Sequence, residues 1–354
     1  MSLDSFNVTS LKKAFLAVCD LPDNENNLNL IDDSVFHTGG ERPWESVLDL
    51  IQVYASNLLN SGLPGPLPDR FGRMTRWAVE QAGFVRADRL TEFSRVEFAR
   101  QAAEHCAMFP LADSSRVDNT AILRAISQGG DSVDPRKTIV RLIDSTEQFC
   151  RYLLDRHGGS AESFSKPFVN CVRGLDARSR VDDAAIFRKR IIGELNFLLM
   201  GPATSPNFLK DSQIGRARQI TNLADTYIGT LAKPDIHVMR FMLVLTGRVL
   251  VDRKEKLDQL TNLAGQELTE LFVKEPPCEK AGWGLWPVGL SAEERCLRDL
   301  NFLAFCNNDA GIVVDRILYM VGAENDSSPI APLRPSDKRE RYEKFLRSLG
   351  LIAW

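Results

Sequence analysis

The sequence predicts an all-α protein. Apolar residues recur at helical spacing along most of the chain, and no segment keeps the two-residue alternation of a half-buried strand. Glycine pairs and Gly-Pro steps, such as Gly129-Gly130 and Gly201-Pro202, separate the helical stretches. The 354 residues are 44% hydrophobic and 26% charged, which is ordinary for a globular protein with a sizeable core.

The composition argues against several classes of protein. No stretch is long and apolar enough to cross a membrane, and residues 1–4 lack the pattern of a secretion signal, so we expect a cytoplasmic protein with no membrane partner. The seven cysteines include no Cys-x-x-Cys pair, which predicts reduced thiols, no metal site and no cofactor. The formal net charge of −3 argues against a non-specific DNA coat but permits a local basic face.

Residues 1–130 are predicted to form an N-terminal helical region. It begins with one short helix near residues 10–18, followed by a polar stretch. A second helix is expected over 43–60, with Pro43 in its first turn. Two or three further helices are expected between residues 88 and 127.

Residues 131–328 are predicted to form a second domain. Outside its centre we expect four helices, over 134–157, over 257–273, from Ser291 onward with a capping box, and over 313–322. Residues 329–354 are predicted to form a proline-rich linker and a final helix that reaches Trp354.

The centre of the second domain is predicted to be a helix, a tight turn and another helix. An apolar stripe from Ile191 to Leu199 predicts the first helix, which Gly201-Pro202 ends. Thr204 or Ser205 is expected to cap the next helix with a side-chain oxygen. The first turn of that helix would offer free backbone N–H groups to a phosphate, with Lys210 further along.

A single carboxylate, Asp235, follows Pro234 at the start of an apolar helix. The simpler interpretation is an N-cap, because the positive end of the helix dipole stabilises a carboxylate. The same geometry also suits catalysis. A carboxylate that faces a cleft can stabilise positive charge on a sugar ring or take a proton from water.

Together, the turn and the aspartate resemble the helix-hairpin-helix DNA glycosylase superfamily, in which a hairpin precedes an Asp-x-His-Val-x-Arg-type segment. Here that segment is Asp235-Ile236-His237-Val238-Met239-Arg240, and the resemblance covers residues 136–322. It implies a two-lobed helical fold with an N-terminal extension, Asp235 as the catalytic residue, and His237 and Arg240 as supporting residues. It also implies DNA contacts by Met200, Gly201, Pro202, Thr204, Ser205, Lys210 and Lys233.

The chain departs from the family pattern in ways that narrow the expected chemistry. Leu199 replaces the first hairpin glycine, and Ala203 stands where lyase members carry a lysine. A Schiff-base mechanism needs an amine nucleophile, so strand cleavage is not expected. The four-cysteine cluster of some members is also missing.

Three functions remain open. The degenerate hairpin and the large N-terminal region look like the divergent branch that acts on hypermodified phage DNA, named for α-glutamyl/putrescinyl thymine pyrophosphorylases. We expect a monomeric, monofunctional glycosylase that flips and excises a modified base from double-stranded DNA, in anti-phage defence. One alternative is transfer of an amino acid or polyamine to a pyrophosphorylated base, with Arg188, Lys189, Arg190 and Lys210 around the leaving group. The other is a DNA-binding module without chemistry, in which Asp235 is only a cap.

Overall fold

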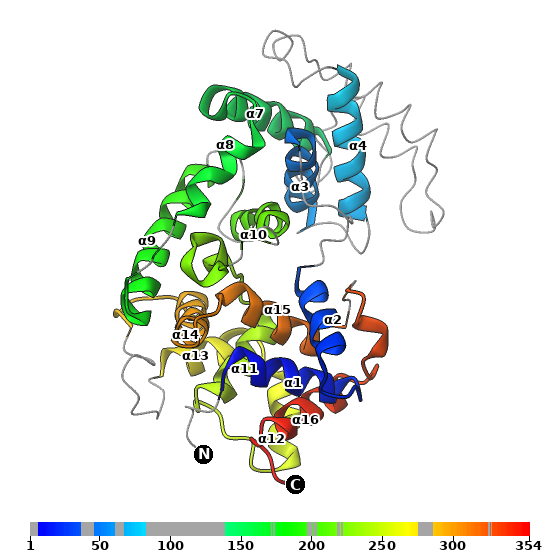
Figure 1. Ribbon diagram of the computed structural model, residues 1–354, viewed down its shortest axis with the longest axis vertical. Helices are drawn as coiled ribbons and strands as arrows, with labels where there is room; N and C mark the ends of the chain where they lie inside the picture. The colour runs from blue at the N-terminus through cyan, green and yellow to red at the C-terminus, as the bar shows by residue number, and fades with distance from the viewer. Residues whose placement is uncertain are drawn as a thin grey trace. The chain divides into compact units, whose positions relative to one another are not determined.

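The computed structural model describes residues 6–36, 46–60, 67–82, 139–170, 172, 174–196, 200, 204–217, 220, 222–274, 286–324, 326 and 328–354. Within these ranges the regular elements are helices and no β-strand is present, which confirms the all-α class (Figure 1). The described helices include none that is long and apolar enough to span a membrane.

The chain divides into two compact units. Unit 1 contains residues 1–41, 169–189 and 217–354, and unit 2 contains residues 42–168 and 190–216. Unit 1 therefore carries both ends of the chain. The domain boundary predicted at residue 130 lies outside the described residues, and the three predicted domains remain a prediction.

Unit 2 is built from helices of the central part of the chain. These are α3 (Val47–Asn60), α4 (Leu67–Ala82), α7 (Ile139–His157), α8 (Ala161–Ser165), the end of α9 (Ala177–Asn196) and α10 (Thr204–Ala217). Its core is aromatic: the Tyr54 ring stacks on Phe149 at a centroid distance of 4.1 Å, and Phe208 meets both rings edge-on. Because Phe208 is fully buried, this core anchors α10, the helix that follows the predicted hairpin turn.

Unit 1 surrounds a nearly buried helix, α15 (Gly311–Gly322). Its other α-helices are α1 (Val8–Val18), α2 (Glu25–Val35), the first part of α9, α11 (Ile236–Leu245), α12 (Lys254–Asn262), α13 (Gly265–Val273), α14 (Ala292–Cys306) and α16 (Lys338–Ser348). α15 packs against α1, α11, α14 and α16, so four segments far apart in the sequence share one core. Two short 3-10 helices, η5 (Leu223–Asp225) and η6 (Tyr227–Thr230), precede α11.

Several predicted helix ends are confirmed. α7 ends at His157, and the predicted capping box starts α14: the Ser291 hydroxyl accepts from the Glu294 N–H at 3.2 Å, while the Glu294 carboxylate accepts from the Ser291 N–H at 2.9 Å. α3 ends at Asn60, as predicted, but it begins at Val47, after the non-helical Ser46, rather than near Pro43, which lies outside the described residues. The helices expected over 88–127 also lie outside them.

Other expectations for local structure were wrong. The polar stretch after α1 leads into a second helix, because the Asn24 side chain accepts from the Asn27 N–H at 3.0 Å and caps α2. The single helix expected over 257–273 is two helices, α12 and α13, with a break after Asn262. The final helix ends at Ser348 rather than Trp354, before Gly350, whose φ of +68° lies in the left-handed region.

Candidate functional site

Asp235 caps α11, which confirms the local prediction. Its backbone is extended, and its Oδ1 atom accepts hydrogen bonds from the His237 N–H at 2.8 Å and the Val238 N–H at 2.9 Å. All eight α11 residues from Val238 to Leu245 are buried. The helix that carries the cap is therefore held by the core, and the cap fixes one carboxylate oxygen relative to it.

The second carboxylate oxygen of Asp235 is in a different situation. Oδ2 has no hydrogen-bond partner within the described part of the chain, and the residue is partly exposed. The positive end of the α11 dipole favours negative charge at this position. One oxygen is therefore restrained by the backbone, and the other is available to a ligand or a water molecule.

His237 lies beside this carboxylate and is half-buried. Its Nδ1 atom is 3.5 Å from the Tyr342 hydroxyl of α16. Burial lowers the pKa of His237 below its ordinary value, opposed by the Asp235 carboxylate and reinforced by the positive charges of Arg240, Lys338 and Arg341. The imidazole is therefore neutral at neutral pH, and its ring nitrogen serves in hydrogen bonding rather than as a fixed charge.

Arg240, the other predicted supporting residue, is only 5% exposed. Its Nε–H donates to the Leu263 carbonyl at 2.8 Å, at the break between α12 and α13, and its side chain is also hydrogen-bonded to Tyr342. These contacts support the helix that carries Asp235. The guanidinium of Arg240 is thus engaged with Leu263 and Tyr342.

A further cation, Arg188 of α9, lies near the segment that leads to Asp235. Its guanidinium donates to the Ala232 carbonyl. Burial lowers the pKa of Arg188 to about 10, and the nearby Asp315 carboxylate opposes this shift, so the group stays protonated at neutral pH. Lys189 and Arg190 are exposed on the same helix; Arg190 and Lys210 belong to unit 2.

The predicted DNA-contacting turn belongs to unit 2, and Gly201 and Pro202 lie outside the described residues. α10 begins at Thr204, so the expectation that Thr204 or Ser205 caps it was wrong: both lie inside the first turn. The Ser205 hydroxyl donates to the Met200 carbonyl at 2.9 Å. Met200 and Ser205 are fully buried. Their predicted contacts with phosphate would therefore need backbone N–H groups.

Two other predicted DNA-contacting residues are lysines. Lys210 is partly exposed on α10, in unit 2, and Lys233 is partly exposed in unit 1, two residues before Asp235. Both contacts remain predictions. No group of three or more His, Cys, Asp or Glu side chains in the described ranges is arranged to hold a metal ion.

The sequence did not point to two residues that shape the site, Tyr342 and Gly322. Tyr342 is fully buried against α11, and Gly322 packs against the His237 ring. The only sequence signal was the apolar spacing of Tyr342, Phe345 and Leu346, which predicts a buried face of α16 but not what covers it.

Comparisons of the chain with protein-family models, with curated proteins and with solved structures give no match. The description of the site therefore depends on the residues and contacts given above.

Proposed function

We propose that this protein is a monofunctional DNA glycosylase that excises a modified base and leaves an abasic site, with Asp235 as the catalytic carboxylate. The carboxylate of Asp235 carries this proposal: two backbone N–H groups hold Oδ1, while Oδ2 has no hydrogen-bond partner among the described side chains and backbone. The surrounding residues Asp235, His237 and Arg240 keep the spacing of the glycosylase segment that they resemble.

The chemistry follows from one oriented carboxylate. In a flipped nucleotide the bond from C1′ of the deoxyribose to the base nitrogen breaks, and the base leaves with the electron pair. Positive charge then develops on the sugar, and a carboxylate oriented in advance stabilises it. A water molecule adds its oxygen to C1′ and gives up a proton, for which Asp235 Oδ2 is the available acceptor.

The proposal also includes a two-lobed helical fold, in which one lobe holds DNA and the other carries the carboxylate. The predicted hairpin lies in unit 2, where the buried Phe208 anchors α10, and Asp235 lies in unit 1, where it caps α11. A helix start such as that of α10 offers backbone N–H groups to a phosphate, which positions DNA without reading its sequence. The proposed partner is double-stranded DNA with a modified base, bound by a monomer in the cytoplasm, in anti-phage defence.

The alternative transferase reaction makes a different demand on the site. It needs several cations around a pyrophosphate leaving group. Of the four basic residues expected there, Arg188 contacts the segment before Asp235, but its guanidinium already donates to the Ala232 carbonyl. The single carboxylate with one available oxygen therefore favours base excision over amine transfer.

The test is to incubate the purified protein with natural and phage-modified duplex DNAs. Alkaline cleavage then reveals abasic sites, and mass analysis identifies released bases and new nucleosides. We expect alkali-labile sites and a free modified base from at least one DNA. An aminated thymine without abasic sites would support the transferase. DNA binding without either product would support the non-catalytic module.

A further inference from the structure

The C-terminal helix α16 contacts the first turns of α11 through Tyr342. This side chain is fully buried, and its hydroxyl lies 3.5 Å from His237 Nδ1. The same side chain is hydrogen-bonded to Arg240, and its ring stacks on Phe241 at a centroid distance of 4.2 Å. One tyrosine of α16 therefore contacts three residues of the helix that Asp235 caps.

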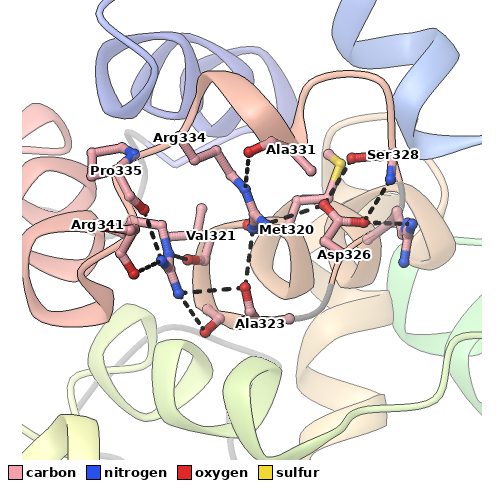
Figure 2. A network of polar contacts seen from close by, with 12 residues as sticks. Met320, Val321, Ala323, Asp326, Ser328, Ala331, Arg334, Pro335 and Arg341 are labelled. Atoms are coloured by element: carbon pink, nitrogen blue, oxygen red, sulfur yellow. Dashed lines mark hydrogen bonds and ion pairs between the residues drawn. The ribbon is translucent and has the colours of Figure 1, made fainter. Parts of the chain in front are cut away.

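α16 is itself fixed to the end of α15 by Arg341, which is 2% exposed (Figure 2). Its Nε–H donates to the Val321 carbonyl at 2.8 Å, and Nη2 donates to the carbonyls of Gly322 at 3.3 Å and Ala323 at 3.4 Å. Nη1 donates to the carbonyls of Pro335 and Ser336, both at 2.8 Å.

These contacts make Arg341 a rigid link between the two helices. The last carbonyls of a helix have no partner within the helix, so this guanidinium satisfies the carbonyls of the buried Val321 and Gly322. The Ala323 carbonyl also accepts from Arg334, at 3.2 Å. The planar, forked shape of the guanidinium fixes the angle of each bond, which a lysine ammonium would not do.

Gly322 connects this link to the candidate site. A Cβ atom at Gly322 would lie 2.6 Å from His237 Cβ and 2.9 Å from His237 Nδ1, so only a glycine allows the helix end to lie this close. His237 is thus held between the last residue of α15 and the Tyr342 hydroxyl. The N–H of His237 in turn donates to Asp235 Oδ1.

We propose that α16 is a positioning element of the Asp235 site, in which Tyr342 and Arg341 hold His237 and thereby orient the carboxylate. Its effect on the reaction rests on the proposed function, whereas its effect on His237 does not. Loss of the Tyr342 hydroxyl should therefore alter the His237 side chain whether or not the reaction is base excision.

The first measurement is the titration of His237 by NMR. The chain has only four histidines, so a His237→Gln variant assigns the His237 signal. In Tyr342→Phe the ring still stacks on Phe241, but the hydroxyl is gone. We expect the pKa of His237 to rise toward its ordinary value, because the neutral imidazole loses its contact with the hydroxyl.

Tyr227→Phe is the matched control in the same unit. The Tyr227 ring stacks on Phe187 at 4.1 Å, and its hydroxyl donates to the Asp183 carboxylate, so the same kind of atom and contact is lost elsewhere. We expect this control to leave the His237 titration unchanged.

The second measurement is base release in single turnover, together with DNA binding. We expect Tyr342→Phe to slow release by about 3- to 10-fold at unchanged DNA affinity, and Tyr227→Phe to match the wild type. Arg341→Lys keeps the positive charge but loses the forked guanidinium that bonds the helix-end carbonyls. If Tyr342→Phe fails to fold, Arg341→Lys should shift the pKa of His237 in the same direction.

The proposed glycosylase function and the positioning role of α16 can be refuted independently. A wild-type protein that releases no base from any DNA would contradict the glycosylase function, while the His237 titration would still test the positioning role. An unchanged His237 pKa in both Tyr342→Phe and Arg341→Lys would overturn the positioning role. An unchanged rate of base release in both variants, with a shifted His237 pKa, would overturn its catalytic consequence.

Discussion

Asparagine and alanine at position 235 should affect stability differently. The Asp235 Oδ1 atom accepts two backbone N–H groups, at 2.8 and 2.9 Å. Asparagine keeps an oxygen at this position and loses only the charge beside the helix dipole, which costs about 0.3–1 kcal/mol. Alanine leaves both N–H groups to solvent, which costs about 1–2 kcal/mol.

Urea denaturation followed by circular dichroism measures this difference, provided that the slopes of the transitions agree between variants. Asn24→Ala is a control for the loss of a cap, because the Asn24 side chain accepts from the Asn27 N–H and caps α2 in the same unit. It should lose about 1 kcal/mol without affecting base release. If Asp235→Ala is as stable as Asp235→Asn, Oδ1 does not anchor α11 and the reasoning is refuted.

Three further predictions concern stability. Gly322→Ala should lower the free energy of unfolding by about 1–3 kcal/mol, because the added methyl group would overpack against His237. Gly193→Ala, whose added Cβ meets nothing within 4 Å, should raise the free energy of unfolding by about 0.5–1 kcal/mol. Denaturant midpoints compare the two variants, and equal midpoints would contradict the close approach of Gly322 to His237. Since folding lowers the pKa of His237, unfolding takes up a proton, so the free energy of unfolding should fall as pH drops below about 6.5. The fall should be smaller in His237→Gln, and the same pH profile in this variant and the wild type would refute the prediction. Asp299→Asn should destabilise unit 1 by about 3–5 kcal/mol, because the Arg248 side chain, 1% exposed and 2.7 Å from Asp299, would keep a buried charge without its partner. Calorimetry measures the loss of stability, and a wild-type melting temperature would contradict the prediction.

Local features of the fold could be predicted from the sequence. The Asp235 cap and the Ser291 capping box depend on atoms within three residues of each other, so residue order alone specifies them. The all-α class follows from apolar spacing for the same reason. The proposed catalytic role of the aspartate rests on the resemblance, because a cap and a catalytic carboxylate need the same local geometry.

Long-range contacts could not be predicted in this way. The contact between Tyr342 and His237 joins residues 105 positions apart, and the bond from Arg341 to Gly322 joins residues 19 positions apart on different helices. A stripe of apolar residues shows that a helix has a buried face but not which helix covers it. The break in 257–273 has a similar origin: the Leu263 carbonyl at the break accepts from Arg240, 23 positions away.

The most direct test of the account is the rate at which Asp235→Asn releases a modified base from duplex DNA, measured in single turnover by mass spectrometry of the free base. The variant should remain folded and bind DNA with wild-type affinity, because the cap is retained. Base release should fall by about 100-fold or more, as expected when a group that stabilises charge in the transition state is lost. Release at the wild-type rate would contradict the assignment of Asp235 as the catalytic carboxylate.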